Sequence, residues 1–200
     1  ASKNYKKILA KLPENTIIVR MNTNGSRMIK ELEGILSKRV MVIVTLSLDG
    51  VEDTHDYVRW PIKWENYIKN VKAYQTLQKQ FPLLRLNSWT TVSCLNVANL
   101  PNILDFTTEH NLDHDWAFLT SPSVYQVRHR NRFTEQAKIK LQSSSYPNCR
   151  ELAKSVAVGQ DNDDELIQKL EEQDNLRKMD YKNYFNFDPN FSRNKEAKRS

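Results

Sequence analysis

The chain has 200 residues, of which 39% are hydrophobic and 27% are charged, and it contains only four glycines. This length fits one domain with a substantial core, and so few glycines argue against a low-complexity chain. The formal net charge of +6 would suit a polyanionic partner, but the basic residues are scattered among acidic ones, so charge alone does not predict nucleic acid as a partner.

Cysteine and histidine usage excludes several kinds of site. Cys94 and Cys149 are too few for a disulfide framework or a cysteine-only metal site, and Cys94 is interpreted as a small buried hydrophobe. His55 and His129 are interpreted as exposed polar residues, because no partner has metal-ligand spacing. There is no Walker loop, GxGxxG motif or readable Ser-His-Asp constellation. Since no secretory signal or membrane-crossing apolar run is found, a cytoplasmic protein without membrane contact is expected.

Hydrophobic periodicity predicts that helices and strands alternate along the first 120 residues. In chain order these are a helix over 3–12, a strand over 16–21, a helix capped by Ser26, a strand over 40–46, a helix from Pro61 to Gln80, a strand over 83–93, a helix starting at Pro101 and a strand over 115–120. This alternation predicts a parallel sheet with right-handed crossovers. Residues 124–128 are a candidate extension of the sheet or an added edge strand, and helices are predicted near 134–141, 147–156 and 163–178.

The central stretch runs from Val40 to Trp60. Its first part is apolar and β-branched on both alternating faces, which predicts a buried central strand covered by helices on both sides of the sheet. The strand runs into Ser47-Leu48-Asp49-Gly50, at the end where parallel α/β folds bind ligands. Arg59 follows closely enough to bring a positive charge back over the same end.

Short polar side chains follow each predicted strand: Asn22, Thr23 and Asn24; Ser47 and Asp49; Thr91, Ser93 and Asn96; and Thr120 and Ser121. Together with the Arg59 guanidinium, they suit a polar, zwitterionic ligand better than they suit hydrolysis. Structural interpretations stay open beside this one. The SLDG segment can be only a strand-ending turn, Arg59 can pair with Asp53 or Asp56 on the surface, and residues 22–24 can only cap the following helix.

The order of these motifs resembles radical S-adenosylmethionine (radical SAM) enzymes. TNG, a hydrophobic strand into SLDG, DYVRW with a long helix, and TTVSCLNVANL are similar to twitch domain-containing radical SAM proteins. Trp64 and Asn70 match the W-x-x-x-x-x-N helix of that family, and residues 174–177 with Tyr184-Phe185 resemble its C-terminal helix. The likeness covers residues 16–191. Each short motif alone is weak evidence for the family, and the order in which the motifs follow one another is more specific.

The resemblance implies a partial (β/α)6 TIM-like barrel that holds a [4Fe-4S] cluster and S-adenosylmethionine. Reductive cleavage at the cluster would yield a 5′-deoxyadenosyl radical that abstracts hydrogen from the substrate. By position, Ser47 and Arg59 would contact the methionyl carboxylate or the ribose of the ligand. Asp49 and Asn24 would be lesser polar contacts, and Thr91 or Ser93 would line the same mouth.

The chain departs from this family at the cluster. The family holds its cluster with three cysteines in a CxxxCxxC loop, which is absent from these 200 residues together with the GGE motif. The sequence therefore resembles the carboxyl-terminal two-thirds of such an enzyme. Residues 1–130 are interpreted as barrel, 131–191 as a helical C-terminal extension and 192–200 as a mobile basic tail. Alone, the chain is expected not to cleave S-adenosylmethionine.

Two functions follow from this interpretation. The whole protein would be a radical SAM oxidoreductase or maturase that takes electrons from a donor and acts on an unknown substrate, a peptide being one candidate. The alternative is a non-catalytic binding module that keeps the strand-end pocket and offers a basic surface to an anionic partner. An exposed sheet edge additionally suggests self-association, because unpaired edges recruit partners.

Overall fold

The structure, a computed structural model, describes residues 11–13 and 15–185. Its sheet has four strands in the order β1-β2-β3-β4, and all neighbouring pairs are parallel. The strands are β1 (Ile18–Thr23), β2 (Met41–Ser47), β3 (Leu84–Val92) and β4 (Asp113–Phe118). The predicted parallel α/β class and the central place of the 40–46 strand are thus confirmed. The helix predicted over 3–12 lies largely outside the described residues, and the tail 192–200 lies wholly outside them.

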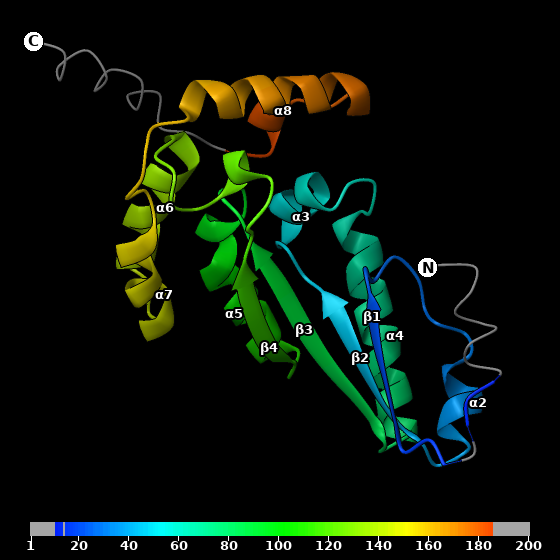
Figure 1. Cartoon of the computed structure of the whole chain (residues 1–200). Helices are drawn as coiled ribbons and strands as arrows, with labels where there is room; N and C mark the ends of the chain where they lie inside the picture. The colour runs from blue at the N-terminus through cyan, green and yellow to red at the C-terminus, as the bar shows by residue number, and fades with distance from the viewer. Residues whose placement is uncertain (1–10, 14, 186–200) are drawn as a thin grey trace, which may run out of the picture.

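The described α-helices follow the predicted alternation and then continue into a helical C-terminal segment (Figure 1). They are α2 (Leu32–Leu36), α3 (Glu52–Val58), α4 (Trp64–Gln80), α5 (Leu100–Glu109), α6 (Arg132–Gln142), α7 (Pro147–Leu152) and α8 (Asp163–Arg177). Among them, no helix has the length and apolar character needed to cross a bilayer.

Helices cover only one face of the sheet, so the expectation of cover on both sides is wrong for the described residues. Along β2, Val42, Val44 and Leu46 are fully buried, whereas the alternate side chains from Met41 to Ser47 are half-buried. The same alternation runs along β3, where exposed Arg85 and Trp89 lie on the less buried face. Figure 1 shows α4 and α5 behind the four arrows. We call the other side the open face.

Four local predictions differ from the structure. Ser26 caps no helix, because α2 begins only at Leu32. Pro61 precedes α4 rather than lying in its first turn, because Asp56 caps this helix by accepting a hydrogen bond from the Trp64 N–H at 2.6 Å. Helix α3 was not predicted, since its sequence EDTHDYV mixes polar and apolar residues. Residues 124–128 form no strand; the chain makes a 3-10 turn over Ser123–Tyr125 instead.

Helix α8 lies at the carboxyl end of the sheet. Figure 1 shows it beyond the arrowheads, close to α3. A buried hydrogen bond joins the two helices, since the Tyr57 hydroxyl donates to the Asp174 carboxylate at 2.9 Å. Around it lies a core cluster drawn from both halves of the chain: Tyr57, Cys94, Val124, Tyr125, Phe133, Leu166, Leu170 and Tyr181. Cys94 is buried there, as predicted.

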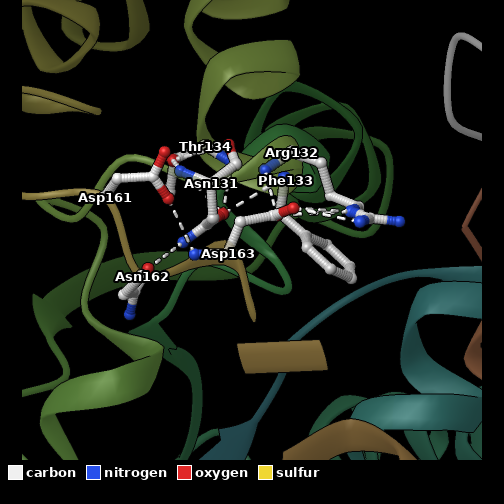
Figure 2. Close-up of polar contacts among 7 residues, drawn as sticks. All are labelled: Asn131, Arg132, Phe133, Thr134, Asp161, Asn162 and Asp163. Carbon is white, nitrogen blue, oxygen red and sulfur yellow. Dashed lines mark hydrogen bonds and ion pairs between the residues drawn. The ribbon is translucent and has the colours of Figure 1, made fainter. Parts of the chain in front are cut away.

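A polar cluster fixes the start of α6 to the start of α8 (Figure 2). The Asn131 side chain caps α6 and also donates to Asn162 at 3.0 Å. The buried Asp163 carboxylate accepts from the Arg132 backbone N–H at 2.8 Å and from the Arg132 guanidinium at 3.0 Å. Each of these polar groups has a partner, and Thr134 completes the capping box. We call this cluster the α6–α8 latch and interpret it as structural.

Candidate functional site

An ion pair lies at the carboxyl end of β2. Asp49 is in the loop after the strand, and Arg59 is the C-cap residue of α3. Their Oδ2 and Nη1 atoms are 3.0 Å apart, and the other Asp49 oxygen accepts a hydrogen bond from the Thr91 N–H on β3 at 2.8 Å. Helix α3 therefore turns the chain back over the strand end, as the position of Arg59 predicted. The surface pairing of Arg59 with Asp53 or Asp56 is not observed.

The pair is poorly solvated. The Asp49 side chain is 12% exposed and the Arg59 side chain 22%. Burial raises the pKa of Asp49, and the Thr91 amide and the Arg59 charge oppose this rise. The Arg59 Nε is buried and has no hydrogen-bond partner among the described residues. The Arg59 Nε–H is thus a hydrogen-bond donor without an acceptor among the described residues, in a site that is largely shielded from water.

The loop that carries Asp49 is more than a strand-ending turn, because three neighbours fix it. The Leu48 N–H donates to the Trp89 carbonyl at 2.8 Å, and the Thr90 hydroxyl donates to the Leu48 carbonyl. The Val51 N–H donates to the Asn99 side chain at 2.7 Å. A Cβ on Gly50 would lie 2.9 Å from the backbone nitrogen of His55, so the close approach of the loop to α3 requires glycine. These contacts hold the carboxylate in place.

Of the six candidate residues, Asp49, Arg59 and Thr91 are in direct contact. Ser47 lies on the open face, opposite Trp89 in the register of β2 and β3. The two other candidates are engaged locally. Buried Ser93 directs its N–H to the Asn96 side chain at 2.8 Å, and exposed Asn24 accepts from the Ser26 N–H at 3.1 Å. The Asn24 contact is a local turn and not a helix cap, because the next helix, α2, begins only at Leu32.

Two buried residues beneath the pair were not among the candidate site residues. His55 is fully buried, so its expected exposure is wrong. Its ring centroid lies 4.7 Å from that of Tyr67 on α4, which is also fully buried. Neither ring nitrogen of His55 nor the Tyr67 hydroxyl makes a hydrogen bond with the described residues. The spacing of Val51, His55 and Val58 places all three on one face of a helix and could have predicted this burial.

Burial controls the protonation of His55 and Tyr67. Burial and, to a smaller extent, the Arg59 charge lower the pKa of His55 to about 4, against smaller opposing effects of the Gly50 backbone and Asp56. Burial likewise raises the pKa of Tyr67, so its hydroxyl stays protonated. At neutral pH both groups are therefore neutral beside a charged pair.

The described residues do not fit an iron–sulfur cluster. No group of three His, Cys, Asp or Glu side chains among them could hold a metal ion. Cys94 and Cys149 are both buried, and they belong to different core clusters. Burial raises the pKa of both thiols, which opposes the thiolate form that a cluster needs.

Comparison of the chain with protein-family models and with curated proteins finds no match. The site therefore has to be interpreted from its own chemistry. A carboxylate and a guanidinium, held side by side at a strand end, can bind the ammonium and the carboxylate of an amino-acid group, respectively.

Proposed function

We propose that this chain is the carboxyl-terminal part of a radical SAM-like partial barrel and that its strand-end site binds S-adenosylmethionine. The observation that carries the proposal is the Asp49–Arg59 ion pair at the carboxyl end of β2. The methionyl group is a zwitterion, so its ammonium would meet Asp49 and its carboxylate Arg59. Ser47 and Thr91 would then contact the rest of the ligand from the open face.

The sheet topology supports this assignment. In a doubly wound fold the strand order reverses and helices cover both faces, whereas in a (β/α) barrel successive strands follow one another and helices lie outside. Here the strand order follows the chain order, and the described helices cover one face. The open face would be the interior of a partial TIM-like barrel.

The chain's own share in this function is to bind and orient the ligand. Because the described residues do not fit a cluster, the thiolates that hold [4Fe-4S] would come from outside these 200 residues. Only the whole protein would then be a radical SAM oxidoreductase or maturase, supplied by an electron donor. The substrate stays open.

Calorimetric titration of the 200-residue chain with S-adenosylmethionine tests the proposal. Arg59→Ala is expected to weaken binding roughly 10- to 100-fold, because a hydrogen bond to a charged group contributes about 1.5–3 kcal/mol. Ser47→Ala is expected to weaken it several-fold. Matched controls are Arg130→Ala, in the ion pair with Glu135, and Ser143→Ala at the end of α6, which should leave affinity unchanged.

Methylthioadenosine, which lacks the amino-acid group, is the control ligand. It is expected to bind much more weakly than S-adenosylmethionine. Equal binding of the two ligands, or equal affinity of Arg59→Ala and the unmodified chain, would refute recognition of the zwitterion by this pair.

A non-catalytic binding module is the second candidate function. The observation that favours it is that the strand-end pair is complete, while the described residues offer no cluster site. Upstream coding sequence distinguishes the two candidates: a CxxxCxxC segment in frame supports the enzyme, and its absence supports the binding module.

A further inference from the structure

The open face carries charged and polar side chains in rows across the strands. Arg20 on β1 and Arg85 on β3 both pair with Ile43 of β2 in the sheet register, so they flank this residue on one row. Both side chains are exposed, and neither makes an ion pair with the residues that the structure describes. Two guanidinium groups are thus available on either side of one apolar side chain.

The next row towards the strand ends is uncharged over three strands. It consists of Asn22, Thr45 and Asn87, and on β4 it ends at Asp113. None of the three polar side chains on β1 to β3 has a hydrogen-bond partner among the described residues. The row beyond it contains Ser47 and Trp89 and ends on β4 at Asp115. The open face is therefore cationic towards its amino end. Between there and the strand-end site it is neutral on β1 to β3 and acidic on β4.

We propose that Arg20 and Arg85 clamp a phosphate group of an elongated ligand that lies along the open face. Their Cα atoms are two strand spacings apart, about 9.6 Å. An arginine side chain is long enough to lean over one strand, so the two guanidinium groups can meet above Ile43. One arginine already satisfies a carboxylate in two-point fashion; two converging arginines match the greater charge and the additional oxygens of a phosphate monoester.

The register also sets the length of the ligand. Ser47 lies four residues after Ile43 along β2, which corresponds to about 13 Å along the strand. A ligand clamped by its phosphate would thus present a group about 13 Å away to the strand-end site. This inference does not depend on S-adenosylmethionine, since the arginines are distinct from Arg59.

Nitrogen-15 NMR of the arginine Nε–H groups in the 200-residue chain, titrated with inorganic phosphate at low ionic strength, tests the clamp. Phosphate is expected to shift the Arg20 and Arg85 signals with a Kd on the order of 1–10 mM, and Arg20→Gln or Arg85→Gln should each weaken binding about 10-fold. Asp113→Asn, which removes a neighbouring negative charge, should strengthen it. Lys72→Gln on α4, which lies on the helix-covered side of the sheet, removes one positive charge elsewhere and should change nothing.

Three outcomes overturn the proposal. The first is the absence of a shift at these two arginines up to about 50 mM phosphate, well above the expected Kd range. The second is succinate binding as tightly as phosphate, which would assign the clamp to carboxylates. The third is loss of binding in Arg59→Ala with both clamp variants unaffected, which would place the anion at the strand-end site. Phosphate binding without S-adenosylmethionine binding would leave the clamp standing and refute the proposed function alone.

Discussion

Acidification is expected to destabilise this protein through His55. The buried imidazole has its pKa lowered to about 4 by burial and by the Arg59 charge, whereas in the unfolded chain it returns to about 6.5. Between these two values the unfolded state binds more protons than the folded state. The contribution of His55 to stability is therefore complete above about pH 6.5 and is lost as the pH falls towards about 4.

The magnitude follows from the two pKa values. Their difference is 6.5 minus about 4, or about 2.5, which corresponds to about 3 kcal/mol when integrated over the whole range. At about pH 4.5, where the transition is not complete, the loss relative to neutral pH is about 2.5 kcal/mol. Asp49 acts in the opposite sense, since its raised pKa makes protonation on acidification favour the folded state.

Comparison with His55→Phe isolates this contribution. Urea unfolding at about pH 7 and about pH 4.5, followed by tryptophan fluorescence, gives the free energy of unfolding of each protein. At neutral pH the variant is expected to be as stable as the wild type or more stable, because phenylalanine fills the site without ring nitrogens that lack partners. On acidification it should lose about 2.5 kcal/mol less than the wild type. His129→Gln serves as the histidine control. An equal loss in His55→Phe and the wild type would refute the reasoning.

Three further substitutions test the packing around the site by urea unfolding. Asp163→Ala is expected to cost about 2–4 kcal/mol, because it leaves the Arg132 guanidinium and backbone N–H without their buried acceptor; Asp163→Asn, which keeps an acceptor without the charge, should cost less, and equal costs would contradict the role given to the acceptor. Tyr57→Phe removes the hydrogen bond to Asp174 and should cost about 1–2 kcal/mol, together with faster hydrogen exchange in α8; unchanged exchange would contradict its role in holding that helix. Gly25→Ala should cost about 1–3 kcal/mol, since this glycine has φ +69° and its added Cβ would collide with an aromatic ring of α4; a neutral effect would mean that the loop adapts.

Hydrophobic periodicity predicted the existence and order of the four strands, although β1 and β4 are each displaced by two residues from their predicted ranges. The predicted helix cover on both faces of the sheet was wrong, because a continuous apolar run is compatible with a strand covered on one face or on both. In β2, Met41 and Ile43 made the run look apolar on both faces, yet they lie on the open face, where they are half-buried. A continuous apolar run thus indicates a central strand, but it does not say how many faces helices cover.

The sequence predicted the residues of the site better than it predicted which of them pair with one another. Sequence order brought Asp49 and Arg59 near one strand end, but it also allowed pairing with Asp53 or Asp56. The choice depends on α3, which occupies residues 52–58 and carries Arg59 back to the β2 loop. That helix has no clear apolar run, so its only local signal is the i, i+4, i+7 spacing of Val51, His55 and Val58. This spacing is compatible with burial of His55, but it does not choose the partner of Arg59.

The contrast between the two polar clusters of the chain indicates where function lies. In the α6–α8 latch the capping side chains and the buried carboxylate have partners, as a structural cluster requires. At the strand end, polar atoms of His55, Arg59 and Tyr67 are buried without hydrogen bonds to the described residues, and an ion pair is held at a desolvation cost. Apolar residues of similar size would avoid this cost. The presence of such polar groups at the ligand-binding end of a parallel sheet supports the proposed ligand site.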